Sequence, residues 1–209
     1  MKYLKIFFVF FFSFSLNAKT LKLPEVISEY VCNTKFIMGA TILETRTFQG
    51  KNKKRIDTVI QNVPQSVIID YGKQTATWVW VKTSSYLSVP LKKENQENLK
   101  KATNITRLDK IKSDYIRGFE VDVYKLKLNL PDGTTEESTR WITKHGITLK
   151  EVGFIQGKEG KIHFYSEFSN VKIFKQDDRL FEVPEGFKIA PIEHLDDVNE
   201  LLKTMVKRS

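Results

Sequence analysis

The chain alternates apolar and polar residues over much of its length, which is the pattern of half-buried β-strands. From Tyr30 onward, runs rich in Val, Ile, Thr, Phe, Tyr and Trp are separated by short clusters of Gly, Asn, Asp and Lys that favour turns. Such short connections favour consecutive antiparallel strands. The predicted strands are residues 29–37, 40–48, 54–61, 65–71, 75–82, 85–90, 118–129, 136–144, 147–156, 160–170 and 171–175.

The phase of the alternation predicts which side chains share a face. Trp78 and Trp80 share one face of their strand and Val79 takes the other, so this strand is apolar on both sides. Near Ser169-Asn170 the apolar phase shifts by one residue, which predicts a bulge or a strand break. Two further apolar rows are expected, one on each of two hairpins: Phe36, Met38, Ala40 and Ile42 in the first, and Ile162, Phe164 and Phe168 in the second.

Two segments depart from the β pattern and favour helix. Residues 92–101 are polar all round, which is typical of a surface helix or a long loop. Residues 191–207 have acidic residues early, basic residues late and apolar residues at three- and four-residue steps. The apolar face of this second helix either packs on the sheet as core or covers a cavity.

The first 18 residues have the organisation of a cleavable signal peptide. Lys2 and Lys5 precede an apolar run from Ile6 to Leu16, and Ala18 ends a short neck. The run is shorter than the roughly 20 residues that cross a bilayer, so an uncleaved anchor is the weaker alternative. Residues 19–209 then form one domain, because no linker divides them, and the protein is expected to be exported from the cytoplasm.

The composition is that of a globular chain with a basic excess. Its 209 residues contain 34 Lys and Arg against 25 Asp and Glu, a net charge of +9. Removal of Lys2 and Lys5 leaves 32 − 25 = +7. Lys outnumbers Arg by 27 to 7, and Arg is the residue that reads bases and phosphates with a bidentate fork, so nucleic acid is not an expected partner.

The sequence contains none of the common catalytic motifs of hydrolases, metalloproteases, phosphate-binding loops or dinucleotide-binding folds. The histidines are His145, His163 and His194, and their spacing does not favour a shared metal. Cys32 is a lone thiol and is expected to be a buried small residue. Asp177-Asp178 and Asp196-Asp197 are interpreted as turn and helix-start residues. We therefore expect no enzyme activity, no metal and no cofactor.

A strongly bent sheet with large apolar residues on its concave face has two possible fillings. It packs against its own helices as an ordinary core, or it leaves room for an apolar ligand. The residues alone leave both alternatives open.

Several short stretches together resemble the LolA-like superfamily of periplasmic lipoprotein-sorting and lipoprotein-carrier proteins. Arg140-Trp141-Ile142-Thr143-Lys144, followed by Gly146-Ile147-Thr148-Leu149-Lys150, resembles that family's paired strands around a turn. The stretch from Leu180 to Lys188 resembles its closing Phe-x-x-Pro-x-Gly-aromatic segment. Earlier stretches follow the same succession: Lys53-Lys54-Arg55, Val67-Ile68-Ile69-Asp70, Thr77-Trp78-Val79-Trp80, Tyr86-Leu87-Ser88-Val89-Pro90 and Gly118 to Tyr124.

This resemblance implies a mainly β (α+β) fold, in which a strongly curved antiparallel sheet forms an incomplete β-barrel covered by helices. The concave apolar face would receive acyl chains of a lipid or lipoprotein for sorting or carriage to the outer membrane, with transient inner- or outer-membrane partners. Arg46 and Arg55 are the candidates for contact with a covering lid. The residues expected to line the ligand site are Phe36, Met38, Ile42, Trp78, Trp80, Phe119, Trp141, Phe164 and Phe168.

Two other functions stay open at this point. One is an envelope interaction or sensor protein with a filled core and no lipid cargo, acting through its basic face or its C-terminal helix. The other is an unrecognised hydrolase, which the missing motifs disfavour.

Overall fold

The computed structural model describes residues 22–60, 62–91, 104–130, 133–158 and 160–190. Within these ranges the chain forms one 12-stranded sheet and a short 3-10 helix, η2. The bounds are β1 (Tyr30–Met38), β2 (Thr41–Gln49), β3 (Lys53–Ile60), β4 (Val63–Asp70), β5 (Thr75–Trp80), β6 (Ser85–Pro90), β7 (Asn104–Ile116), β8 (Phe119–Asn129), β9 (Thr135–Thr143), β10 (Thr148–Gly157), β11 (Gly160–Ile173), η2 (Asp178–Phe181) and β12 (Lys188–Ile189).

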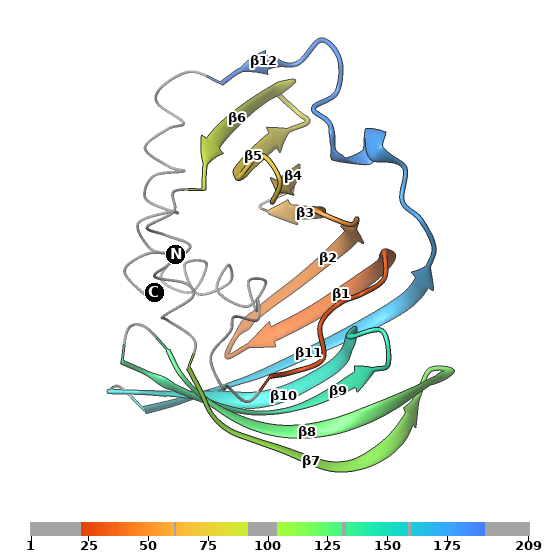
Figure 1. Ribbon diagram of the computed structural model, residues 1–209. Helices are drawn as coiled ribbons and strands as arrows, with labels where there is room; N and C mark the ends of the chain where they lie inside the picture. The colour runs from red at the N-terminus through yellow and green to blue at the C-terminus, as the bar shows by residue number, and fades with distance from the viewer. Residues whose placement is uncertain (1–21, 61, 92–103, 131–132, 159, 191–209) are drawn as a thin grey trace.

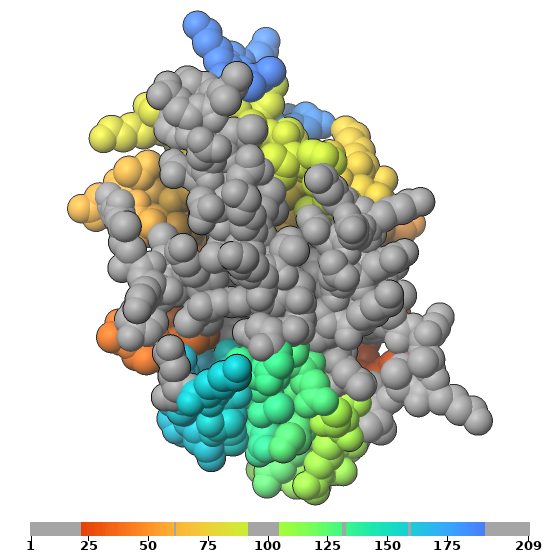
Figure 2. All heavy atoms as spheres, turned by 90° about the vertical axis from the view of Figure 1, so that its left-hand side faces the viewer, coloured from red at the N-terminus to blue at the C-terminus, as the bar shows by residue number. Residues whose placement is uncertain are grey.

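The sheet consists of two antiparallel meanders joined along one seam. Its strand order is β12-β6-β5-β4-β3-β2-β1-β11-β10-β9-β8-β7, so β1 to β6 and β7 to β11 each pair in sequence and β1 pairs with β11. Only β12 pairs in parallel, with β6, among the described strands. The sheet curls strongly, so that β3 to β6 and β7 to β10 lie at opposite ends of the curve (Figure 1). From the open side, β5–β6 and β8–β10 again occupy opposite ends of the molecule (Figure 2).

The fold class expected from the sequence, a strongly curved and unclosed antiparallel sheet, is confirmed. Each predicted strand has a counterpart, although the segment predicted as a separate strand over residues 171–175 is the end of β11. Strand β7 was missed by the sequence argument. It is the edge strand and carries charged residues on both of its faces, so it lacks the half-buried alternation that marks the other strands.

The phase shift near Ser169-Asn170 is a bulge, as predicted. Asn33 pairs with Ser169 but Val31 pairs with Lys172, so Cys32 lies opposite two residues of β11. Asn170 adopts a positive φ of 52° at this point. The bulge returns Val171 and Ile173 to the apolar cluster that contains Phe168.

The two faces of the sheet have different coverings. We call the inner face the side that carries Phe36, Trp78 and Phe164, and the outer face the opposite side. A strap, residues 174–187, runs along the outside of the curve from β11 to β12 (Figure 1). On the outer face, Phe181 of the strap packs with Ile68 and Val79.

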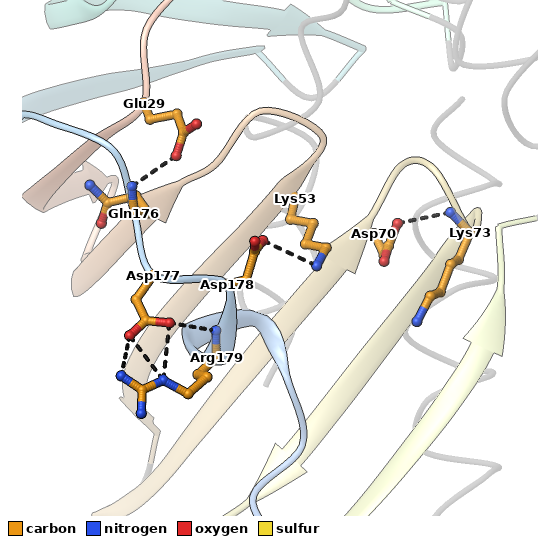
Figure 3. Close-up of polar contacts among 8 residues, drawn as sticks. All are labelled: Glu29, Lys53, Asp70, Lys73, Gln176, Asp177, Asp178 and Arg179. Atoms are coloured by element: carbon orange, nitrogen blue, oxygen red, sulfur yellow. Dashed lines mark hydrogen bonds and ion pairs between the residues drawn. The ribbon is translucent and has the colours of Figure 1, made fainter.

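Polar contacts hold the strap in place (Figure 3). The backbone N–H of Gln176 donates to the Glu29 carboxylate at 2.8 Å. Asp177 caps η2 by accepting from the Arg179 backbone N–H, and its neighbour Asp178 accepts from Lys53 at 3.4 Å. The two aspartates therefore point to different partners and serve as turn residues, as expected.

Three expectations lie outside the described residues: the signal peptide at residues 1–18, the polar helix or loop at 92–101, and the amphipathic helix at 191–207. The described part of the chain contains no helix with the length and apolar character needed to cross a membrane.

Candidate functional site

The inner face of β4, β5 and β6 is an apolar surface. Strand pairing brings Val67, Trp78 and Leu87 side by side across the three strands, because Val67 pairs with Trp78 and Trp78 pairs with Leu87. The row below them, Ile69, Ala76 and Val89, is formed in the same way and is equally buried. Trp80 is half-buried at the edge of this cluster.

A second apolar cluster lies on the inner face at the seam between the two meanders. Phe36, Met38, Leu43 and Phe164 are buried together there, and the Phe36 and Phe164 rings stack with centroids 6.5 Å apart. Phe164 lies over Gly153, where an added Cβ would come within 2.8 Å of the ring and 2.4 Å of a backbone oxygen. Glycine at this position therefore lets the phenyl ring pack directly on the strand.

A buried charged cluster occupies the inner face of β9 and β10. The Arg140 guanidinium donates to Glu151 and, at 3.1 Å, to Glu136, which also accepts from Ser138 at 2.8 Å. Arg140, Glu136 and Glu151 are all less than one-tenth exposed. Burial raises the pKa of Glu136, although the nearby Arg140 charge opposes the rise. Two carboxylates thus share one cation.

A polar band crosses the inner face of β1, β2 and β3. Its members are Cys32, Thr34, Thr45, Thr47 and Lys54, all buried. Thr45 pairs with Thr34, and Thr47 pairs with Cys32. Burial lowers the pKa of the Lys54 ammonium to about 8 and raises that of the Cys32 thiol to about 12. This band is not among the predicted sites, although the sequence contains the alternating polar pairs Thr45-x-Thr47 and Cys32-x-Thr34.

Six of the predicted lining residues lie on the inner face: Phe36, Met38, Trp78, Trp80, Phe164 and Phe168. The shared face expected for Ile42 is wrong. Met38 pairs with Thr41 and Phe36 with Leu43, so the two-residue turn places odd-numbered residues of β2 beside even-numbered residues of β1. Ile42 therefore faces outward and is 61% exposed.

Trp141 also lies on the outer face. Its neighbour Arg140 pairs with Glu151, which pairs with Ser166 of the inner face, so Trp141 must point the other way. Lys150 confirms this, because its ammonium lies 4.9 Å from the Trp141 ring centroid. The neighbouring residue Arg140 faces inward instead, because Glu136 and Glu151 neutralise its charge there.

Phe119 is half-buried at the start of β8. It packs against the cluster that contains Tyr30, Val121 and Ile147. The same cluster contains Cys32 and is contacted by Phe168 and Trp141, so the structure brings Phe119 to inner-face residues of β1 and β11.

The two arginines proposed as lid contacts both belong to the outer face. Arg55 donates to Asp57 at 2.6 Å, to the Leu180 carbonyl at 3.0 Å and to Ser66 at 3.2 Å, so it binds the strap to β3 and β4. Arg46 is exposed, with its guanidinium 5.1 Å from the Phe48 ring centroid. Arg55 therefore anchors the strap to the sheet.

Other candidates for chemistry are accounted for by packing. His145 Nδ1 lies 2.8 Å from Ser28 Oγ in a turn, and His163 contacts the Phe154 ring. His194 lies outside the described residues. Cys32 is buried, as expected. Within residues that the structure describes, no group of three or more His, Cys, Asp or Glu is placed to hold a metal ion.

The outer face carries a groove of about 1010 Å³ that crosses β1 to β4. Its polar lining includes Lys35, Arg46 and Glu44, and Ile42, Val59 and Val81 lie among its apolar residues. Lys35 pairs with Glu44, and Arg46 with Asp57, so its charges are largely balanced across neighbouring strands.

Comparison with known proteins identifies the fold. The structure is similar to an uncharacterized conserved protein from Thermus thermophilus, with a TM-score of 0.53 at 10% identity over 78% of this chain and 90% of that one. MucB of Pseudomonas aeruginosa, solved in complex with MucA, has a TM-score of 0.48 at 10% identity over 76% of this chain and 56% of that one. This chain thus matches little more than half of MucB.

The Mycobacterium tuberculosis lipoprotein LppX has a TM-score of 0.43 at 12% identity over 76% of this chain and 91% of that one. No family model and no curated protein matches the sequence. Identities this low concern the fold alone. At that level, the chain shares the fold of the Thermus thermophilus protein.

Proposed function

We propose that this protein binds the acyl chain of a lipid or lipoprotein against the inner face of its sheet. The observation that carries the proposal is the pair of apolar clusters on that face, one around Trp78 and one around Phe36 and Phe164. Strand pairing puts both clusters on the same side of the sheet, opposite the face on which the strap packs. The sequence resemblance to lipoprotein-sorting proteins supports the same function.

The proposed mechanism is burial of apolar surface, with no bond made or broken. Each methylene transferred from water contributes about 0.8 kcal/mol, so a long acyl chain offers about 10 kcal/mol before ordering costs are subtracted. An affinity reduced by those costs allows release as well as capture. Such reversible binding suits a protein that takes cargo from one membrane and delivers it to another.

The finer parts of the proposal follow from the resemblance. The protein would act in the periplasm after removal of residues 1–18, and its cargo would be a lipoprotein on its way to the outer membrane. Surface lysines would favour approach to anionic membranes, an attraction that salt screens.

The experiment that tests the proposal is lipid extraction from the purified full chain, followed by mass spectrometry and by titration with a fluorescent fatty acid. We expect co-purified lipid and saturable binding. A chain that carries no lipid and binds no acyl probe would contradict the proposal.

Two variants show whether binding occurs on the inner face. Trp80→Ala removes a half-buried inner-face ring and should weaken acyl binding about tenfold, because an indole buries a large apolar area. Ile42→Ala removes an outer-face side chain that is 61% exposed and should leave affinity unchanged. Equal losses in both variants would count against the inner face.

The outer groove favours a second candidate function, that of an interaction protein without lipid cargo. A partner in the groove would be displaced by Arg46→Glu and unaffected by Trp80→Ala. The reverse result would leave acyl binding as the function.

A further inference from the structure

The polar band lies between two apolar regions of the same face. Ile69 pairs with Lys54 and belongs to the cluster around Trp78, whereas Phe36 follows Thr34 on β1 and belongs to the cluster at the seam. A ligand that spans the inner face would therefore cross the band. A purely apolar ligand would leave these polar groups in contact with hydrocarbon, which is unfavourable.

Two hydroxyl groups of the band are unsatisfied. Among the described residues, Thr45 Oγ1 and Thr47 Oγ1 are buried and have no hydrogen-bond partner. Thr45 is 6% exposed and Thr47 is 0% exposed. A buried hydroxyl without a partner costs about 1 to 3 kcal/mol of stability. A ligand oxygen that accepted from both hydroxyls would remove that cost.

Lys54 brings a positive charge to the same place. On β3, Lys54 lies two residues before Ile56, which pairs with Thr47 of β2. Lys54 is therefore a diagonal cross-strand neighbour of Thr47. Diagonal neighbours in a sheet lie about 7 to 8 Å apart at their backbones, which a lysine side chain spans. Its pKa of about 8 keeps the ammonium mostly protonated at neutral pH despite its burial.

The other polar cluster of the inner face has a different electrostatic character. Arg140 donates to both Glu136 and Glu151, so its charge is already engaged by two carboxyl groups of the protein. An added anion would have to compete with those two carboxyl groups for the Arg140 guanidinium. The polar band around Lys54 is therefore a better site for the anionic end of a ligand than the Arg140 cluster.

From this geometry we infer that Lys54, Thr45 and Thr47 form a headgroup site that selects an anionic amphiphile, one whose phosphate or carboxylate seats on the band while its acyl chain lies on the adjoining apolar clusters. The inference rests on the proposed acyl-binding function and specifies its ligand class. The ammonium supplies the charge, and the two hydroxyls donate hydrogen bonds to the anionic oxygens.

Calorimetric titration of the full chain with three probes tests this site. The probes are dodecyl phosphate, monododecanoyl glycerol and inorganic phosphate, each below any micelle-forming concentration. We expect dodecyl phosphate to bind at least tenfold more tightly than the neutral glyceride, because hydrogen bonds to a charged group are worth about 1.5 to 3 kcal/mol. Inorganic phosphate should bind far more weakly, since it lacks the chain.

The outcomes separate the two proposals. Equal affinity for the two amphiphiles would overturn the headgroup site and leave acyl binding intact, whereas no binding of either would overturn both. Inorganic phosphate binding as tightly as dodecyl phosphate would identify a site for free phosphate and overturn the amphiphile.

Variants assign the effect to the band. Lys54→Met keeps the aliphatic length and should abolish the preference for dodecyl phosphate without weakening the glyceride. Thr47→Val is nearly isosteric and should reduce dodecyl phosphate affinity several-fold while raising the melting temperature, because it removes an unsatisfied hydroxyl. A hydroxyl with only a structural role would not move affinity and stability in opposite directions. An unchanged preference in both variants would contradict the assignment.

Discussion

Arg140 is a buried cation held between two carboxylates, so one negative charge of the cluster has no counter-charge of its own. The effect is seen at Glu136, whose pKa is raised. Burial destabilises the ionised carboxylate more than the Arg140 charge stabilises it. Removing one member of such a buried cluster usually destabilises a protein, since it leaves the others uncompensated. Glu136 is the member whose neutralisation leaves the Arg140–Glu151 pair complete.

Glu136→Gln should therefore change the pH dependence of stability. The folded-state pKa lies above the ordinary 4.5, so the native state holds the Glu136 proton over a pH range in which the unfolded chain has lost it. Wild-type stability falls as pH rises through that range, whereas the amide of the variant cannot titrate. The free energy of unfolding of the variant, relative to wild type, should rise between about pH 5 and about pH 8 in urea denaturation.

Glu137→Gln is the matched control for this titration. Glu137 is the next residue, lies on the opposite face, and its pKa is lowered by a hydrogen bond from Lys127. Its stabilising contribution is fully present above the unfolded pKa and is lost in acid, so the glutamine variant should show an opposite and smaller trend confined to pH values below about 5, and no trend between about pH 5 and about pH 8. Identical profiles for the two variants would show that Glu136 does not hold its proton.

Residue placement could be predicted from the sequence only where strand parity was certain. Trp78 and Trp80 lie within a single strand, so alternation alone put them on one face. Ile42 follows a two-residue turn, after which odd-numbered residues of β2 share a face with even-numbered residues of β1. The alternation of apolar and polar residues does not determine the length of that turn. Trp141 faces outward because Arg140 has buried carboxylates inside, and these partners come from β9 and β10 together. Long-range pairing of that kind is not contained in local alternation.

The strap is the element that distinguishes the two faces of the sheet. Phe181 sits over Gly50, where an added Cβ would approach the ring to 3.0 Å, and packs against Ile68 and Val79. Arg55 holds the adjoining Leu180 carbonyl. The outer side of β3 to β5 is therefore covered by the strap.

Phe181→Ala should destabilise the protein by about 3 kcal/mol, because a buried phenyl ring is lost without a replacement. Phe174→Ala is the control, since that ring belongs to the same strap but is 51% exposed, and it should cost less than about 0.5 kcal/mol. Chemical denaturation measures both. A Phe181 variant as stable as wild type would mean that the strap is not anchored by its ring.

Among the elements, the consecutive hairpins could be predicted from the sequence, whereas the edge strand β7 could not. Turn residues separated by alternating runs identified the meanders, since each hairpin is a local structure. Strand β7 is exposed on both faces and carries Arg107–Asp109 and Lys112–Asp114 ion pairs, so it has the composition of a surface loop. The bulge opposite Cys32 was predictable because a one-residue shift of apolar phase requires one.

At the scale of the whole molecule, the two meanders depend on one seam. Strand β1 pairs with β11 although well over half of the chain separates them in sequence, and the Phe36–Phe164 stack lies at this junction. No hairpin closes the seam, so its pairing requires both meanders to be formed. The inner face, with an apolar cluster at the seam and another on β4 to β6, exists only when they are joined.

We therefore expect the meanders to unfold together. Trp78 and Trp80 report on the first meander and Trp141 on the second, so Trp141→Phe and the double variant Trp78→Phe/Trp80→Phe give separate fluorescence signals. In each variant, the urea midpoint measured by fluorescence should coincide with the midpoint measured by circular dichroism. Adding Phe164→Ala should lower the midpoints of both variants by the same amount, equivalent to about 3 to 5 kcal/mol, because the ring supports the seam shared by both halves. Loss of only the Trp141 signal at low urea would instead show that β7 to β11 unfold as an independent unit.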